Sequence, residues 1–426
     1  MAHFGLVCPP GSSHVTGLTT IARELCARGH RATVFNILDV EDLASREGVE
    51  FRPLGVRNHP KGAFKAFSER QSQLQGLTAL RFGLKMAREE IAMLLEEAPD
   101  AMRTAGVTAL LVDQGQPAGS TMAERLNVPF VTVCNALAVN PDPQVPPAML
   151  GWGPATTGAA RLRSRFAYWA FDLAATPLRS VINRYRKAWN LTPLRSLYDT
   201  FSPTLQLAQQ SAEFDFPRDA LPPQFHYIGL IRRVSSSSVP FPFERLDGRP
   251  LVYASLGTMT NDSKGVFRII AEACATLDVQ LVLTLGGNGD VAAYANLPGA
   301  PVVVAFAPQL ALLERAAAAI FPGTNSVLES LTQGVPVIAV PMYADQFGLA
   351  ARLERSGAGG RISLDRLEAG ALRTLLDRLL SERSYAERAR AIGASLERAG
   401  GERRAADLIE ESLGRALTPG RERLGA

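Results

Sequence analysis

The sequence of 426 residues contains little cysteine, no long hydrophobic run and little net charge. Its four cysteines, Cys8, Cys26, Cys134 and Cys274, follow no metal-binding spacing and are too few for a disulfide scaffold. The absence of about 18 consecutive apolar residues excludes a membrane-spanning helix. The first residues, MAHFGLVCPP, lack the charged start and apolar core of a signal peptide. Together these absences predict a reduced, cytoplasmic protein.

The net charge of +4 is small for a chain of this length, and no block of lysine and arginine resembles a nucleic-acid-binding arm. We therefore expect no nucleic-acid partner. Hydrophobic residues make up 46% and charged residues 20% of the chain, a composition that supports a large buried core. A chain of this length predicts roughly two or three domains.

Short apolar segments alternate with amphipathic ones along the chain, which predicts an α/β fold with parallel sheets. Candidate helices separate most of these segments, for example at residues 16–28 and 265–277. Because the segments are apolar throughout, we expect strands that are buried on both faces. The predicted strands are residues 4–8, 32–35, 110–112, 130–134, 205–207, 251–255, 281–285, 302–306, 319–321 and 337–340.

The stretch RRVSSSSVPFPF at residues 232–243 has no apolar periodicity and is typical of a linker. It divides the chain into two doubly wound, Rossmann-like domains that we expect to face each other across a cleft. The predicted domains are residues 1–232 and 244–400, joined by a linker at 233–243. Residues 401–426 are expected to form a helix that returns to the N-terminal domain, followed by a frayed tail.

A turn in the second half follows an apolar segment and opens a predicted helix. It consists of Gly323, Thr324, Asn325 and Ser326. Backbone N–H groups at such a helix start are unpaired and attract phosphate. Thr258, after Leu256 and Gly257, offers a hydroxyl at a neighbouring strand end. This arrangement predicts a diphosphate site, although Ser326 and Glu329 also have the spacing of a capping box.

Asp345 and Gln346 directly follow another predicted buried strand. A carboxylate beside a carboxamide can accept from and donate to neighbouring hydroxyls, as a sugar requires, but the pair also fits a surface turn. Phe306 ends the strand before the Pro308-Gln309 turn. It can stack on a base at the edge of the cleft, or it can belong to the core.

In the first half, His14 follows the first predicted strand and leads into a helix. A histidine there suits a general base near neutral pH, provided that a carboxylate orients its other ring nitrogen. Asp113, at the end of the strand 110–112, is the natural candidate. Both residues also have simpler interpretations, His14 as a helix-entry residue and Asp113 as a loop cap.

Residues 161–189 carry seven lysines and arginines and one acid, interleaved with aromatic residues. A basic, aromatic, amphipathic stretch of this kind can lie on an anionic membrane surface. It can equally line an apolar acceptor pocket, or pack with its arginine stems along the protein surface.

Residues 306–346 resemble the donor-binding signature of the family 1 UDP-glycosyltransferases, which have the two-domain GT-B fold. The layout of the whole chain is similar, and residues 250–360 are the most similar part. Within this family, the stretch DQFGLAARLERSGAG and the opening HFGLVCPPGSSHVTGL most resemble the bacterial zeaxanthin glucosyltransferase branch.

The resemblance implies an inverting transfer of a hexose, expected to be glucose, from a UDP-sugar to a hydroxyl of a lipophilic small molecule such as a carotenoid, terpenoid or polyketide. It implies no metal and no cofactor beyond the UDP-sugar co-substrate. His14 matches the base and Asp113 its partner. The donor positions that match are Phe306 and Ala307 for the uracil, Gln309 and Glu329 for the ribose, Thr258, Gly323, Thr324, Asn325 and Ser326 for the phosphates, and Asp345 and Gln346 for the sugar.

One position departs from the family pattern. Relatives carry a histidine just before the phosphate-binding turn, whereas this turn reads Ile-Phe-Pro-Gly at residues 320–323 and is one residue shorter. The departure keeps open an alternative, a non-catalytic or donor-altered binding protein with the same fold. A nicotinamide-dependent oxidoreductase is disfavoured, because the first strand is followed by PPGSSHVTG and not by G-x-G-x-x-G.

Overall fold

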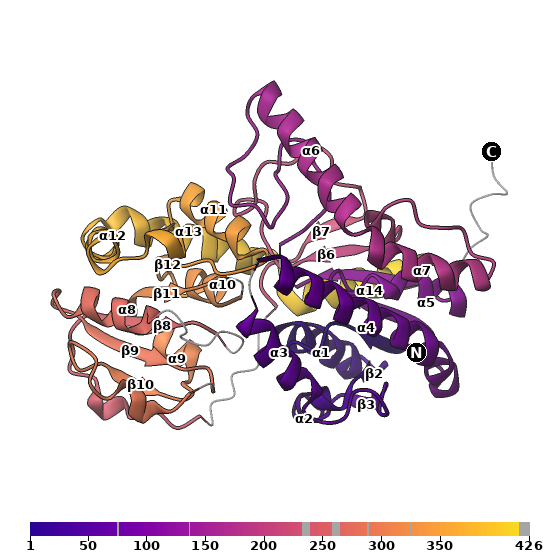
Figure 1. Ribbon diagram of the computed structural model, residues 1–426, viewed down its shortest axis with the longest axis horizontal. Helices are drawn as coiled ribbons and strands as arrows, with labels where there is room; N and C mark the ends of the chain where they lie inside the picture. The colour runs from indigo at the N-terminus through magenta and orange to yellow at the C-terminus, as the bar shows by residue number, and fades with distance from the viewer. Residues whose placement is uncertain are drawn as a thin grey trace.

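The computed structural model describes residues 1–74, 76–135, 137–231, 239–257, 265–287, 289–323 and 325–416. Two predicted site residues, Thr258 and Thr324, and most of the predicted linker at 233–243 lie outside the described residues. Two parallel sheets, one in each half of the chain, dominate the fold (Figure 1). They confirm the prediction of an α/β protein with two doubly wound sheets.

The first sheet has seven strands in the order β3-β2-β1-β4-β5-β6-β7, all parallel. In chain order these are β1 (His3–Val7), β2 (Arg31–Asn36), β3 (Glu50–Pro53), β4 (Ala109–Asp113), β5 (Phe130–Cys134), β6 (Gln206–Ala208) and β7 (Phe225–Tyr227). The helices of this half are α1 (Ser12–Ala27), α2 (Glu41–Arg46), α3 (Ala63–Gln73), α4 (Gly76–Ala105), α5 (Ala118–Leu126), α6 (Gly158–Ala174) and α7 (Thr176–Ala188).

The second sheet has six parallel strands in the order β10-β9-β8-β11-β12-β13. They are β8 (Leu251–Ser255), β9 (Gln280–Thr284), β10 (Val302–Val304), β11 (Ala316–Phe321), β12 (Val337–Ala339) and β13 (Gly359–Arg361). Its helices are α8 (Val266–Cys274), α9 (Gln309–Leu313), α10 (Asn325–Thr332), α11 (Gln346–Ser356), α12 (Ala369–Ser381) and α13 (Arg383–Arg398). Short 3-10 turns lie at Leu38–Val40, Leu197–Thr200, Phe243–Arg245, Val291–Tyr294 and Leu364–Arg366.

The last helix, α14 (Gly401–Ala416), leaves the second half and packs against α1 of the first (Figure 1). Five of its residues join the core around the first sheet: Ala405, Ala406, Leu408, Ile409 and Leu413. The chain therefore crosses between the halves twice.

All ten predicted strands are present; two have the predicted bounds, and the ends of the others differ by at most three residues. Three observed strands were not predicted, namely β3, β7 and β13. β3 and β7 close the two edges of the first sheet and β13 closes one edge of the second, and none of them carries a long apolar run. One wrong strand end concerns the site. The strand predicted at residues 302–306 ends at Val304 as β10, so Phe306 lies beyond it.

Both sheets reverse their strand order at one point, between β1 and β4 and between β8 and β11. In open α/β sheets such a reversal opens a crevice at the carboxyl ends of the strands. Parallel pairing aligns Val7 of β1 with Val112 of β4, so Asp113 lies at the end where the chain leaves β1. The two crevices face a shared cleft of about 790 Å³ that is lined by residues from both halves.

A buried ionic cluster also joins the halves. Asp215, which lies between β6 and β7, accepts from Arg218 Nε and from Arg352 Nε of α11, each at 2.7 Å. Burial raises the pKa of Asp215, but the two guanidinium charges outweigh burial and lower the pKa to about 2. Asp215 is therefore ionised at neutral pH and holds α11 against the first half.

Candidate functional site

The first half contributes a histidine–carboxylate pair to the cleft. His14 lies in the first turn of α1, and Asp113 is the last residue of β4. His14 Nδ1 is 2.8 Å from Asp113 Oδ2. The Asp113 side chain is fully buried, whereas 30% of the His14 side chain is exposed. With Nδ1–H donated to the carboxylate, Nε2 of a neutral imidazole remains free to take a proton.

Asp113 has two further partners that hold its orientation. Gly115 N donates to Oδ1 at 2.7 Å, and Asn135 Nδ2 donates to Oδ2 at 2.6 Å. Asn135 can approach only because residue 17 is glycine, since a Cβ at Gly17 would lie 1.9 Å from Asn135 Oδ1. Sequence reasoning missed Asn135. The available signal was its position directly after the strand Phe130–Cys134.

These contacts set the protonation of the pair. Burial lowers the pKa of His14, but the adjacent Asp113 carboxylate outweighs burial, and the pKa is raised above its ordinary value. Burial raises the pKa of Asp113, but the His14 charge and the hydrogen bonds from His14, Asn135 and Gly115 lower it below its usual range. Asp113 therefore stays ionised while His14 titrates.

A second carboxyl group lies close to this pair and was not predicted. Glu90, on α4, accepts from Gln116 Nε2 at 2.9 Å, and Gln116 follows Asp113 by three residues. Burial raises the pKa of Glu90 to about 7, although the hydrogen bond from Gln116 and the charge of His14 oppose the shift. Glu90 thus titrates in the same pH range as a histidine.

On the opposite side of the cleft, the turn before α10 comes close to the start of α11. A Cβ at Gly323 would lie 3.0 Å from Gln346 Cγ, so only glycine allows this approach without a shift. Gln346 Oε1 accepts from Met342 N at 2.8 Å and from Tyr343 N at 3.2 Å. The cleft lining includes the predicted positions Gly323, Asn325, Ser326 and Gln346, as we expect if they belong to one site.

Gln309 connects two other predicted positions of the second half, Ser326 and Glu329, and also contacts Tyr253, which was not predicted. Its Nε2 donates to Ser326 Oγ at 3.2 Å and also to Glu329 Oε2. Its Oε1 lies 3.4 Å from the hydroxyl of Tyr253, which comes from β8. Gln309, Ser326 and Glu329 therefore form one polar cluster at the start of α9 and α10.

Phe306 and Asp345 both belong to the lining of the same cleft. The Phe306 ring is 54% exposed and rests against Gly287, where a Cβ would lie 2.3 Å from the ring. Ala307 follows it along the lining. Asp345 Oδ2 accepts from Leu137 N of the first half at 3.3 Å, and burial raises the pKa of Asp345. The structure thus brings every described predicted site residue except Asp113 to the wall of one cleft, and Asp113 lies behind His14.

An aromatic core pair lies at the turn 320–323, the turn that departs from the family pattern. Phe321, the last residue of β11, is 1% exposed and packs edge-on against Tyr253 with ring centroids 5.6 Å apart. Pro322 and Gly323, which follow β11, form the cleft wall here, and apolar side chains lie behind their backbone.

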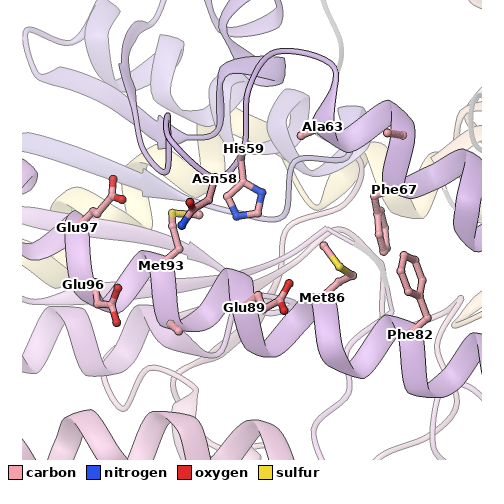
Figure 2. Close-up of a pocket in the computed structure, with 12 residues that line it drawn as sticks. Asn58, His59, Ala63, Phe67, Phe82, Met86, Glu89, Met93, Glu96 and Glu97 are labelled. Carbon is pink, nitrogen blue, oxygen red and sulfur yellow. The ribbon is translucent and has the colours of Figure 1, made fainter.

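A second cavity of about 740 Å³ lies between α3 and α4 and was not predicted (Figure 2). At one end, Phe67 and Phe82 face each other with ring centroids 5.7 Å apart, beside Met86. Glu96 and Glu97 lie at the other end. Glu90 is on the same helix, one turn after Met86, so α4 links this cavity to the surroundings of His14.

The described ranges hold neither a candidate metal-binding cluster nor a candidate membrane-spanning helix. No group of three or more His, Cys, Asp or Glu side chains gathers there in a way that could hold a metal ion. Within the same ranges, no helix combines the length and apolar character needed to cross a membrane.

Comparison with known proteins gives matches along most of the chain. Residues 56–395 match the model of a family described as UDP-glucoronosyl and UDP-glucosyl transferase. The zeaxanthin glucosyltransferase of Pantoea ananas is 34% identical over 417 residues, which cover 97% of this chain and 96% of the relative. That of Pseudescherichia vulneris is 34% identical over 423 residues, 97% and 98% of the two chains. The crystal structure of CalG4, the calicheamicin glycosyltransferase, superposes with a TM-score of 0.78 at 23% identity, covering 98% of this chain and all of that one.

Proposed function

Because the chain belongs to the UDP-glucoronosyl and UDP-glucosyl transferase family and is a glycosyltransferase, we propose that it transfers glucose from UDP-glucose to a hydroxyl of a lipophilic small molecule. The observation that carries the proposal is the 2.8 Å contact between His14 and Asp113 in a cleft whose other wall holds Gly323, Ser326 and Gln346. An acceptor base and a donor site would then face each other across the cleft.

The proposed reaction is a single displacement. His14 Nε2 removes the proton of the acceptor hydroxyl as its oxygen attacks the anomeric carbon. The bond from that carbon to the UDP oxygen breaks, and UDP leaves with the electron pair. Attack opposite the leaving group inverts the anomeric centre. Asp113 holds the imidazole in the productive tautomer and stabilises the imidazolium that forms.

The donor contacts proposed for the second half need no metal. N–H groups at the start of α10, around Asn325 and Ser326, would hold the diphosphate together with Gly323 and the hydroxyls of Thr324 and Thr258. The exposed face of Phe306 would stack on uracil, whose edge would pair with the Ala307 backbone. The proposed contacts are Gln309 and Glu329 for the ribose, and Asp345 and Gln346 for the glucose hydroxyls.

The acceptor would enter through the first half. We place its apolar body in the cavity between α3 and α4, where Phe67, Phe82 and Met86 supply apolar surface (Figure 2). Two relatives are named zeaxanthin glucosyltransferases, so a hydroxylated carotenoid is the first acceptor to test, and hydroxylated terpenoids and polyketides come next. A cytoplasmic location is part of the same proposal.

The test is a transfer assay with UDP-glucose and hydroxylated carotenoids in detergent micelles, read by product mass and by the anomeric configuration of the product. We expect a mass gain of one hexose, an inverted linkage and full activity in the presence of a metal chelator. A retained linkage would contradict the single displacement, and activity lost to the chelator would contradict metal independence. GDP- and dTDP-sugars in parallel reactions test the choice of uridine.

The comparisons give no support to the alternative of a non-catalytic binding protein. Calorimetry with UDP and UDP-glucose separates that alternative from the proposal. Binding of an acceptor without measurable binding of either nucleotide, and without product, would favour the alternative.

A further inference from the structure

The outward face of α6 is an exposed apolar stripe. Leu162, Phe166, Trp169 and Leu173 are 67%, 65%, 59% and 55% exposed. Their spacing of four, three and four residues places them on one side of the helix. The rings of Phe166 and Trp169 lie 5.4 Å apart, so the stripe is continuous at its centre. Four large apolar side chains together on one face mark an interaction surface.

The opposite side of α6 anchors the helix to the protein. Ser164, Ala167 and Tyr168 are buried there. In Figure 1, α6 projects from the upper edge of the molecule, above the elements that follow it. The helix is thus attached by one side and presents the other outwards.

The charges next to the stripe are positive. Arg161, Arg163 and Arg165 are exposed in the first half of α6. The one acid of the helix, Asp172, is already engaged, since it accepts from Arg179 Nη1 and from Ser196 Oγ, each at 2.7 Å. The partner that fits this face is therefore both apolar and anionic.

We propose that α6 lies flat on an anionic lipid bilayer, with Leu162, Phe166, Trp169 and Leu173 inserted at the headgroup boundary. An interfacial helix has these features: a narrow apolar stripe that includes tryptophan, basic neighbours and too little apolar length to span. This proposal rests on the proposed function only where it explains why the protein would bind a bilayer, namely that a lipophilic acceptor dissolves there.

This surface is smaller than the whole basic, aromatic stretch 161–189. In α7, Tyr185 packs on the core of the first half, as does Trp189 just after the helix, and Arg125 lies 5.3 Å from the Trp189 ring. These side chains pack within the protein and leave the bilayer contact to α6 alone.

The same packing connects the bilayer-facing helix to the acceptor cavity. α7 follows α6 directly and packs against α4. The hydroxyl of Tyr185 donates to Glu96, which lines the cavity between α3 and α4. If α6 holds the protein at the bilayer surface, the acceptor cavity therefore lies two helices away from the lipid.

The test is co-sedimentation of the full chain with phosphatidylcholine vesicles that contain or lack phosphatidylglycerol, with no sugar donor or acceptor present. We expect binding that needs the anionic lipid and falls at high salt. The double variant Phe166→Gln and Trp169→Gln should lose at least about tenfold in vesicle affinity. The variant Arg161→Gln with Arg165→Gln should lose the preference for phosphatidylglycerol.

Val291→Gln is the matched control, because Val291 is another exposed apolar residue, 37% exposed, in the second half. It should bind vesicles like the original chain. Thermal unfolding and transfer to a water-soluble hydroxylated acceptor check that the α6 variants remain folded, and both should be unchanged.

Three outcomes would overturn the proposal: no vesicle binding by the original chain, equal binding by the Phe166→Gln and Trp169→Gln variant, or a dimer in solution that this variant dissociates. The last would make a second copy of the chain the occupant. Because the vesicle assay contains no substrate, a failure of the proposed function would appear separately, as vesicle binding without transfer.

Discussion

The two sheet edges that meet in the cleft share one topology but differ in chemistry. At the reversal between β1 and β4, the side chains are ionisable and mutually coupled: His14, Asp113 and, beside them, Glu90. At the reversal between β8 and β11, the described wall offers mostly neutral groups, including the amides of Gln309 and Gln346 and the start of α10, and the carboxyl group of Glu329 there accepts from Gln309. Under the proposed function, the same reversal would serve proton transfer in one half and anion binding in the other.

The difference shows what each task demands of the backbone. A base needs its pKa adjusted by burial and by one fixed charge, and the complete burial of Asp113 beside a partly exposed His14 agrees with the proposed base role of His14. An anion site needs oriented N–H donors, which a helix start supplies without a side-chain charge. Fold alone predicts neither outcome, because both halves have the same strand order around the reversal.

The strongest way to break this comparison is His14→Ala. We expect transfer to fall by about 10²–10⁴-fold, the usual contribution of a general base, while UDP binding stays the same because the second half is intact. Turnover and calorimetry measure the two effects. His226→Ala is the control, since His226 lies in β7 and does not line the cleft. Undiminished turnover in His14→Ala would refute the base assignment.

Asp113→Asn tests the coupling within the first half. We expect kcat to fall about 10- to 100-fold, because the imidazole loses its orienting carboxylate. Asp113 raises the pKa of His14, and a base works only when neutral, so transfer is lost as the pH falls through that raised pKa. In the variant this acid limb should move to lower pH. A pH–rate profile with an unmoved limb would show that Asp113 does not set the protonation of His14.

Phe306→Ala tests the cleft wall of the second half, around the reversal between β8 and β11. Loss of a stacked base costs about 1–3 kcal/mol, so the Kd for UDP should rise about tenfold or more, with the acid limb unchanged. Phe243→Ala is the control, because this exposed aromatic of the second half pairs with Arg315 and lies off the cleft lining. Equal UDP affinity in Phe306→Ala and the original chain would remove Phe306 from the donor site.

Glu90→Gln should have the smallest effect. It removes a negative charge that helps to raise the pKa of His14, so the acid limb should move to lower pH by less than in Asp113→Asn. The hydrogen bond with Gln116 can be kept by the amide, and kcat should change only a few-fold. A larger loss than in Asp113→Asn would mean that Glu90 itself touches the acceptor.

The sequence predicted those parts of the site that follow directly from strand ends. Short apolar runs located β1, β4 and β11, and parallel strands place their carboxyl ends together, so the pairing of His14 with Asp113 was predictable. The ribose roles of Gln309 and Glu329 were implied only by the family resemblance, and the hydrogen bonds that join Gln309 to Ser326 and Glu329 were not predicted. The donor and base roles stay predictions, including those of Thr258 and Thr324, which lie outside the described residues.

The missed parts depend on contacts between segments that are far apart in the chain. Asn135 reaches Asp113 past Gly17, Glu90 on α4 reaches Gln116 in the turn after β4, and Leu137 N reaches Asp345 from the other half. A local pattern can place Asn135 at a strand end, but none marks the contacts themselves. The cavity between α3 and α4 was missed for the same reason, since its apolar lining looks like an ordinary buried helix face in the sequence.

The return of α14 to the first half has a consequence for the way the protein matures on the ribosome. Ile409 and Leu413 complete the hydrophobic cluster beneath α1, the helix that bears His14, yet they are synthesised only after the whole second half. Domains generally fold as units during synthesis. Here the unit that is translated first must wait with an uncovered apolar surface until the second half and α14 have been made, so it needs protection from aggregation for longer than its early position in the chain suggests.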